Sequence, residues 1–298
     1  MKSNYNCIII LGPTASGKTK LAVEIASEKN GEIISIDSRQ VYKKLNIGTG
    51  KDLEEYGNIP YHLIDIVEPT HRYHVHAFAK DFYSAFSKIK DKSKLPILCG
   101  GTGLYFDTLL KKNELISVPV NDDLRKQLNG KNSQELQKIY NSYKHSGKYS
   151  FDNSTVKRQI RSIEILDYLK NNSVPKINFH ELNPLIIGVK TTLEQRRANI
   201  SKRLRNRLKN GLIEETEGLI GDGISHEQLQ YFGLEYKFLS YYLLGKLSKE
   251  EMISQLETAI HQYAKRQMTW WRKMEREGLK INWMQTIDEV QRILNNEI

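Results

Sequence analysis

The stretch LGPTASGKTK at residues 11–20 constrains the fold of this chain more than any other feature of the sequence. It matches the P-loop pattern, in which two glycines bracket four residues and a Lys-Thr pair follows. The apolar run CIII at 7–10 reads as a buried strand, and a helical pattern follows up to Asn30. Such a turn is a cradle for a polyphosphate, because its backbone N–H groups converge and the helix points its positive end at the anion.

The predicted cradle has two residues with side-chain roles. Lys18 adds a positive charge, and the Thr19 hydroxyl is a candidate ligand of Mg²⁺. The full set of expected phosphate-binding residues is Gly12, Pro13, Thr14, Ala15, Ser16, Gly17, Lys18 and Thr19. A P-loop indicates that a phosphate is bound but does not identify the reaction, since kinases, hydrolases and some transferases share the motif.

Four further apolar runs predict strands, at 32–37, 62–67, 95–101 and 185–190. Together with the first strand they predict an α/β fold, a P-loop NTPase-like parallel sheet flanked by helices. Ligands bind beyond the carboxyl ends of such strands. The P-loop, DSRQ at 37–40 and GGTGLY at 100–105 are therefore expected to share one rim.

The part of the chain from 117 to 182 has helical patterns and no convincing strand. We expect a core domain of residues 1–116 and 183–298, interrupted by a helical insertion at 117–182. The length of 298 residues is enough for this arrangement.

The balance of charge favours a polyanionic partner larger than one nucleotide, because 45 Lys and Arg face 35 Asp and Glu, a net charge of +10. Both cysteines, Cys7 and Cys99, lie in apolar runs and are expected in the core of a protein from a reducing cytosol. The sequence has no apolar run near 18 residues and no signal pattern, so we expect a cytoplasmic protein with no membrane association.

Two later helices carry clustered charge. Thr192 begins the first, on which Arg196, Arg203 and Arg207 follow the edge of an apolar stripe. On the second, Arg266 shares a face with aromatic residues. An arginine in such surroundings needs an anion, and a buried carboxylate is as good a candidate as a ligand phosphate.

Two carboxylates are candidates for the chemistry of the rim. Asp37 ends the strand beside the P-loop strand, where it could hold Mg²⁺ through water or act as a general base. Asp65 is a second candidate for the metal role, although a structural role suits it better.

Several separated motifs resemble the bacterial tRNA dimethylallyltransferases over nearly the whole chain. These are GPTASGKT at 12–19, DSRQVY at 37–42, NIGTGK at 46–51, GGTGLY at 100–105, the arginine helix and AKRQMTWWR at 264–272. The resemblance implies transfer of a dimethylallyl group from dimethylallyl diphosphate to N6 of adenine 37, beside the anticodon of tRNA. It also implies that the P-loop holds the diphosphate, that pyrophosphate is released and that no ATP is consumed.

This chemistry suits the residues of the rim. An adenine amine is a poor nucleophile because its lone pair is delocalised, so a carboxylate such as Asp37 must accept a proton as the C–N bond forms. Departure of pyrophosphate builds negative charge that backbone N–H groups, Lys18 and Mg²⁺ at Thr19 stabilise. The resemblance adds Arg203 to this catalytic set.

The resemblance also implies a set of tRNA contacts, which would explain the excess positive charge. The helical insertion would grip the anticodon stem-loop while the adenine is pulled out of its stack. The implied contacts are Asp37, Ser38, Arg39, Gln40, Thr102, Arg125, Lys157, Arg158, Gln159, Ile160, Arg161, Lys265, Arg266 and Gln267.

The chain departs from the family pattern in two places, with GTGKD at 48–52 for the common GTAKP, and FGLEYKF at 232–238 for a segment with GYR or GYK. The tRNA contact of the second motif is not carried over. His71, His74 and His76 have metal-like spacing, but a solvated loop is favoured.

Three other functions stay open from the sequence. A P-loop kinase or ATPase would turn over ATP, and a non-catalytic RNA-binding protein would carry a vestigial P-loop. Prenylation of free adenine nucleotides is disfavoured by the basic insertion. A monomer is the expected state.

Overall fold

The computed structural model describes residues 5–143, 147–176 and 180–297. The chain divides into two compact units, Met1–Leu110 with His180–Ile298, and Lys111–Phe179. We refer to them as the core unit and the insertion unit. The insertion unit begins and ends earlier along the chain than the predicted boundaries of 117 and 182.

The core unit contains one six-stranded sheet in the order β3-β2-β4-β1-β5-β6, and all its strand pairs among the described residues are parallel. The predicted α/β fold with a parallel sheet is confirmed. The strands are β1 (Cys7–Leu11), β2 (Gly31–Ile36), β3 (Tyr61–His62), β4 (Leu95–Gly100), β5 (Pro184–Val189) and β6 (Asn282–Met284).

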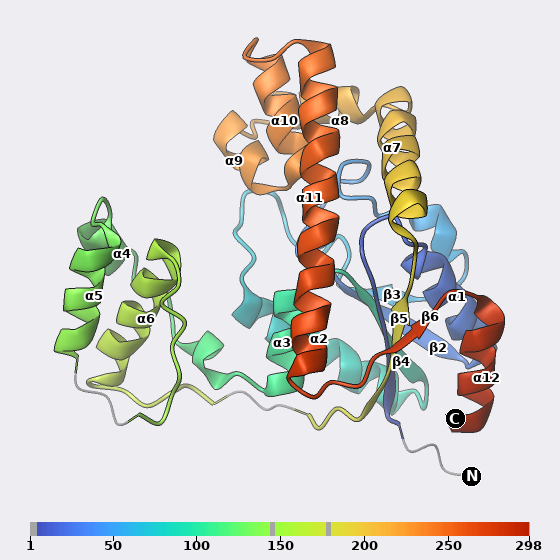
Figure 1. Ribbon diagram of the computed structural model, residues 1–298, viewed down its shortest axis with the longest axis horizontal. Helices are drawn as coiled ribbons and strands as arrows, with labels where there is room; N and C mark the ends of the chain where they lie inside the picture. The colour runs from blue at the N-terminus through green and yellow to red at the C-terminus, as the bar shows by residue number, and fades with distance from the viewer. Residues whose placement is uncertain (1–4, 144–146, 177–179, 298) are drawn as a thin grey trace. The chain divides into compact units, whose positions relative to one another are not determined.

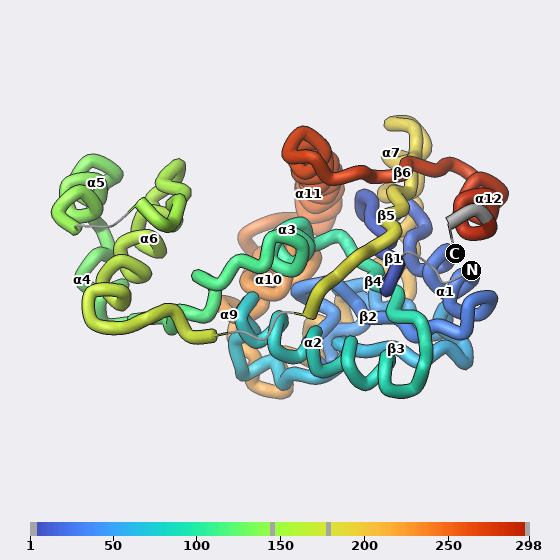
Figure 2. The backbone as a smooth tube through the Cα atoms, turned by 90° about the horizontal axis from the view of Figure 1, so that it is seen from below, coloured from blue at the N-terminus to red at the C-terminus, as the bar shows by residue number. Residues whose placement is uncertain are grey.

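Helices cover both faces of this sheet. Figures 1 and 2 show α1 and α12 on one side and α2, α3 and α11 on the other. The helices of the core unit are α1 (Lys18–Glu28), α2 (Val75–Asp91), α3 (Gly103–Lys111), α7 (Leu193–Lys209), α8 (Leu212–Gly221), α9 (His226–Tyr231), α10 (Leu234–Leu243), α11 (Lys249–Arg276) and α12 (Ile287–Glu297), with a 3₁₀ turn at Leu53–Tyr56.

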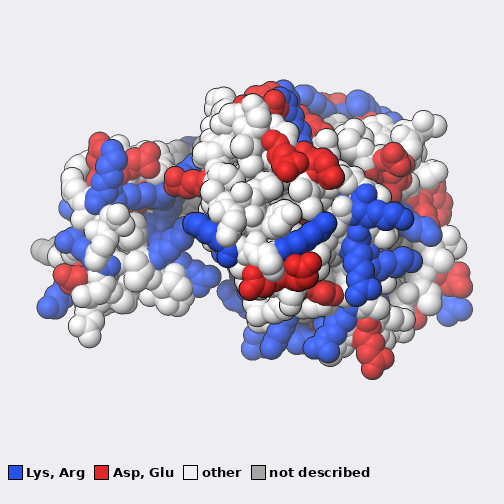
Figure 3. Space-filling view, turned by 90° about the horizontal axis from the view of Figure 1, so that it is seen from above, with Lys and Arg blue, Asp and Glu red and all other residues white. Residues whose placement is uncertain are grey.

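The surface is rich in charge. Lys and Arg form several groups on the face in Figure 3, with smaller groups of Asp and Glu between them. Within the part of the chain that the structure describes, no helix combines the length and apolar character needed to cross a membrane.

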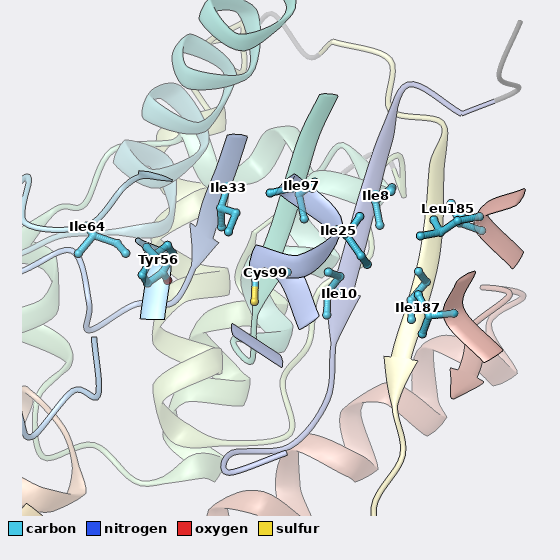
Figure 4. Packing of buried hydrophobic residues seen from close by; sticks show 14 residues of the cluster. Ile8, Ile10, Ile25, Ile33, Tyr56, Ile64, Ile97, Cys99, Leu185 and Ile187 are labelled. Atoms are coloured by element: carbon cyan, nitrogen blue, oxygen red, sulfur yellow. The ribbon is translucent and has the colours of Figure 1, made fainter. Parts of the chain in front are cut away.

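The core between the sheet and α1 is built from alternate residues of the strands. Ile8 and Ile10 of β1 pack with Ile25 of α1, and Ile97 and Ile187 of the neighbouring strands extend the layer, as Figure 4 shows. These side chains are fully buried, so they hold the strand that leads into the P-loop against α1 and the neighbouring strands.

One strand prediction is wrong. The run at 62–67 was expected to be a strand, but β3 ends at His62 and only an isolated bridge joins Tyr42 to Val67. Leu63 and Asp65 have φ angles of 62° and 56°, which extended strands do not allow. Asp65 turns to pair with the buried ammonium of Lys51. Leu63 and Ile64 are therefore buried in a loop, whereas Ile66 is exposed.

The insertion unit is helical, with α4 (Asp122–Leu128), α5 (Ser133–Ser142), α6 (Val156–Leu169) and a 3₁₀ turn at Glu114–Ser117. Leu128, Leu136 and Ile163 form its small core. A capping box of Asn132 and Glu135 begins α5.

A buried carboxylate joins β2 to its surroundings in the core unit. Glu32 is 1% exposed and accepts hydrogen bonds from His62 Nε2 at 2.7 Å and Lys92 Nζ at 3.1 Å, and Lys94 Nζ lies 2.9 Å away. Burial by itself raises the pKa of Glu32, but His62, Lys94 and Lys92 outweigh it and lower the pKa to about 2.

This cluster predicts an acid-sensitive contribution to stability. The pKa of Glu32 lies below its unfolded value of about 4.3, so the stabilisation is complete above pH ~4.3 and is lost as pH falls toward 2. We expect Glu32→Gln to lower the free energy of unfolding by roughly 2–3 kcal/mol at neutral pH. Urea titrations of both proteins should converge between pH 4 and pH 2, and a pH-independent difference would contradict the assignment.

Candidate active site

The P-loop forms the turn between β1 and α1. Ala15 and Gly17 have φ angles of 60° and 84°, and this left-handed backbone is easiest for glycine. Lys18 Nζ donates to Pro13 O at 2.7 Å, so its ammonium folds back over the loop. The loop thus has the curled backbone and overlying cation of a phosphate cradle.

Side chains from two distant helices hold the P-loop from outside. Asn199 of α7 donates to Ala15 O at 3.2 Å, and Arg203 donates to the Thr14 hydroxyl. Gln267 of α11 accepts the Thr14 N–H at 2.8 Å. The loop is therefore tied to residues 189 and 253 positions further along the chain.

The two cations at the P-loop lie in a desolvated setting. Burial lowers the pKa of Lys18 to about 8, with a further lowering from the nearby Arg203. Burial also lowers the pKa of Arg203 to about 10, with repulsion from Arg207 in the same direction. Both side chains carry charge at neutral pH, and an anion between them would relieve the cost of their burial and repulsion.

The Ser16 side chain is a second indication that the P-loop binds a ligand. Its Oγ is buried and has no hydrogen-bond partner among the described residues. Buried hydroxyls in folded proteins almost always have a partner, so a bound acceptor is expected at this point.

Asp37 immediately follows β2 at the carboxyl end of the sheet, on the same rim as the P-loop. Its Oδ1 accepts the backbone N–H groups of Arg39 at 2.8 Å and Gln40 at 3.3 Å. The Ser38 N–H donates to the Thr102 hydroxyl at 3.2 Å, which joins this turn to the 100–105 loop. Both backbone bonds use the same carboxylate oxygen, so they orient the carboxyl group through Oδ1.

A cavity of about 710 Å³ in the core unit joins these pieces. It brings the predicted P-loop residues from Thr14 to Thr19 together with Asp37 and Arg203, as the shared-rim prediction expected. Other walls come from the 48–50 loop, from α7, from the segment that joins α9 to α10 and from α11. Its residues include Tyr263 and Arg207, which the sequence did not single out as site residues.

Glu215 of α8 organises one wall of the cavity. Its carboxylate accepts three successive backbone N–H groups, from Asn46 at 2.9 Å, Ile47 at 2.8 Å and Gly48 at 3.0 Å. Tyr236 also donates to it at 2.7 Å. No sequence pattern indicated this role, because an acid in the first turn of a helix is ordinarily interpreted as a partner of the helix dipole.

The segment FGLEYKF at 232–238 also lines the cavity. Glu235 lies 3.6 Å from the buried guanidinium of Arg207, which also lies 3.5 Å from Asp52. Arg207, one of the three arginines along the apolar stripe of α7, therefore has two carboxylate partners. In the segment that departs from the family's GYR or GYK pattern, Glu235 thus belongs to an ion-pair cluster with Arg207 and Asp52.

The second candidate carboxylate, Asp65, has a structural partner. Lys51 is 1% exposed and donates to Tyr42 O at 2.7 Å, to Asn46 Oδ1 at 2.9 Å and to Asp65. A buried ammonium needs such a full set of acceptors. Asp65 is thus engaged by Lys51 and does not line the cavity.

The predicted tRNA contacts of the core unit fall into two groups. Arg39 stacks on the Tyr231 ring at 4.5 Å, and Lys265 and Arg266 are exposed on α11. Gln267, in contrast, is only 7% exposed and has both ends of its amide bonded to the backbone of the core.

The predicted contacts of the insertion unit also differ in their surroundings. Lys157 and Arg158 are exposed on α6. Arg125 Nε and Arg161 both bind the buried Glu164, the first at 2.9 Å. Two others face inward: Gln159 is buried with its amide oxygen 3.1 Å from the Ser133 hydroxyl, and Ile160 packs against the small core.

The site supplies hard oxygen donors for a divalent metal. The Thr19 hydroxyl and the Asp37 carboxylate both line the cavity. Among the described residues, no group of three or more His, Cys, Asp or Glu could hold a metal ion, and this includes the histidines at 71–76. A cation at this rim would therefore take most of its ligands from a bound diphosphate and water, as Mg²⁺ commonly does.

The fold and site together define a P-loop α/β protein whose cavity is lined by the P-loop, Asp37 and Arg203. A model of the family described as IPP transferase matches residues 40–274, and one described as isopentenyl transferase matches residues 5–57. The chain belongs to the IPP transferase family, as the motifs predicted, and is an enzyme of the prenyl-transferring type.

Curated relatives and solved structures agree with this assignment. The chain is 50% identical to tRNA dimethylallyltransferase 2 of Phocaeicola vulgatus over 98% of this chain and 97% of that protein. It is 51% identical to a Bacteroides fragilis protein of the same name over 94% and 93%. The crystal structure of a tRNA isopentenylpyrophosphate transferase from Bacillus halodurans matches 98% of this chain and 95% of its own with 31% identity and a TM-score of 0.71.

Proposed function

We propose that this protein transfers the dimethylallyl group of dimethylallyl diphosphate to N6 of adenine 37 in tRNA and releases pyrophosphate. The observation that carries the proposal is the single cavity into which the P-loop cations and the Asp37 carboxylate both open. The proposal also draws on the names of the relatives, which are nearly as long as this chain.

The P-loop half of the cavity suits the leaving group. As the bond between the allylic carbon and the diphosphate oxygen breaks, negative charge grows on the departing oxygens. Lys18 and Arg203 both bond to the P-loop, and together with its backbone N–H groups they would stabilise this charge. Mg²⁺ held by Thr19 would neutralise part of the diphosphate charge when bound.

Asp37 suits the other half of the reaction. The adenine N6 forms a bond to the allylic carbon and must lose a proton, and the carboxylate can accept it. Bonds from the Arg39 and Gln40 N–H groups hold the carboxyl group in place for this step. The proton therefore leaves through the same cavity in which the new C–N bond forms.

The charge of the protein suits a nucleic-acid substrate. The net charge is +10, and the exposed Lys157, Arg158, Lys265 and Arg266 are available for phosphates. A target adenine must leave its stack to reach the Asp37 carboxylate inside the cavity, and a cavity of about 710 Å³ has room for one base beside the donor. We further propose that the enzyme acts as a cytoplasmic monomer.

The donor chemistry predicts a distinctive product. Purified enzyme with Mg²⁺ and dimethylallyl diphosphate should release pyrophosphate only when unmodified tRNA is added. No ATP turnover should be stimulated by tRNA. A coupled pyrophosphate assay with parallel measurement of ADP checks both statements, and tRNA-stimulated ATP hydrolysis without pyrophosphate from the donor would favour a P-loop ATPase.

The basic face of α6 predicts a salt effect on tRNA affinity. Replacing Lys157 or Arg158 by Ala should each flatten the slope of log affinity against log salt by about one unit or less. Arg125 and Arg161 are unsuitable for this test, because their removal would leave the buried Glu164 carboxylate unpaired.

The matched control for this test is Lys126→Ala, which removes an exposed lysine of the same unit. Its slope should equal that of the unchanged protein. An unchanged slope in the Lys157 and Arg158 double mutant would mean that these side chains are solvated charge without tRNA contact.

A further inference from the structure

Gln267 differs from every other residue in the predicted tRNA-binding set of α11. Its neighbours Lys265 and Arg266 are exposed, whereas its own side chain is 7% exposed. The α11 face that carries it also buries Ala264 and Trp271, and Trp271 packs edge-on against Phe106 at 5.5 Å. Gln267 therefore belongs to the packed side of the helix.

Both ends of the Gln267 amide bind backbone that forms the cavity. Its Oε1 accepts the N–H of Thr14 in the P-loop at 2.8 Å, and its Nε2 donates to Gly101 O at 2.9 Å. Thr14 is the second residue after Gly12, the first glycine of the P-loop, and Gly101 begins the loop after β4. One side chain thus joins the two loops at the carboxyl ends of adjacent strands.

Gly101 is shaped to receive this amide. A Cβ at position 101 would lie 2.3 Å from Gln267 Nε2, closer than real contacts allow. The φ of Gly101 is outside the left-handed region, so the backbone itself would accept alanine. An alanine at position 101 would therefore displace the end of the Gln267 side chain without straining its own backbone.

We infer that Gln267 is a positioning residue of the diphosphate cradle and not a tRNA contact. It fixes the Thr14 end of the P-loop relative to the 101–105 loop, so that the phosphate-binding N–H groups keep their spacing. Arg203 reaches the same Thr14 through its hydroxyl, and the two side chains together fix this residue from two helices. The inference rests on the proposed function, because it assigns the held loop to the diphosphate of the donor.

Three variants test the inference with inorganic pyrophosphate and Mg²⁺ as the probe. Gln267→Leu keeps a side chain of similar volume but removes both hydrogen bonds, and it should weaken pyrophosphate binding on the order of tenfold. Gly101→Ala should displace the amide and give a similar loss. Gln262→Leu makes the same chemical change at an exposed position of the same helix and should leave pyrophosphate affinity unchanged.

A double-mutant cycle separates positioning from general damage. In a Gln267→Ala background the atom that clashes with position 101 is gone, so Gly101→Ala should cost little further affinity. Fully additive losses would overturn the link between the two residues. In steady state, the donor KM of Gln267→Leu should rise while kcat at saturating donor stays near that of the unchanged enzyme.

Titration of unmodified tRNA completes the experiment. Gln267→Leu should bind tRNA with unchanged affinity. Weaker tRNA binding with unchanged pyrophosphate binding would overturn the inference and restore the tRNA-contact role. If the unchanged protein binds pyrophosphate but transfers no prenyl group, the proposed function fails while the positioning result can still be obtained from binding alone.

Discussion

Asp37→Asn should slow prenyl transfer by roughly 10²- to 10⁴-fold, the range expected for loss of a positioned proton acceptor. The amide keeps an oxygen that can accept the Arg39 and Gln40 N–H groups, so the turn after β2 should keep its shape. Donor and tRNA affinities should therefore stay close to those of the unchanged enzyme. Single-turnover transfer at saturating donor and tRNA measures the chemical step directly.

A magnesium titration decides between the two roles of Asp37. If the carboxylate is the base, the rate of Asp37→Asn stays low at every Mg²⁺ concentration. Thr19→Val, which removes a metal-ligating hydroxyl, should instead raise the Mg²⁺ concentration needed for half-maximal rate. Recovery of Asp37→Asn to the unchanged rate at high Mg²⁺ would show that Asp37 acts through the metal.

Arg203→Gln should lower the rate of transfer by roughly 10²- to 10³-fold, as loss of one preorganised charge donor does elsewhere. Arg203 lies against the Thr14 hydroxyl and carries its charge at neutral pH, because its pKa falls only to about 10. The negative charge on the departing pyrophosphate would lose a partner that water cannot replace inside the cavity.

The control for Arg203 lies on the same helix. Arg205 is exposed and does not line the cavity, so Arg205→Gln removes an equal charge without touching the site. Its transfer rate should be unchanged. Equal losses in both variants would mean that α7 acts only through its overall charge.

The sequence predicted the parts of this protein that depend on local patterns. The P-loop is readable because its glycines, its Lys-Thr pair and the flanking strand and helix are contiguous. The strands at 32–37, 95–101 and 185–190 were visible as apolar runs, and the structure places strands there. The common position of the three motifs on one rim was predictable because parallel strands bring their carboxyl ends to one edge of the sheet.

Features that depend on distant partners were not visible. The run at 62–67 is apolar like a strand, but the buried Lys51 draws Asp65 into a left-handed turn. The short β6 (Asn282–Met284) pairs with β5 almost 100 residues away and has too few residues to make a pattern. Glu215 could be recognised only after folding brought its carboxylate to the 46–48 backbone.

Prenylation of tRNA at one adenine is the central claim, and digestion of the product tRNA to nucleosides tests it most directly. After incubation with dimethylallyl diphosphate and Mg²⁺, mass analysis should find N6-dimethylallyladenosine in the anticodon-loop fragment. The same tRNA with guanine in place of adenine 37 should yield none. Absence of the prenylated nucleoside from the adenine-containing tRNA, with donor, metal and folded enzyme all present, would contradict the account.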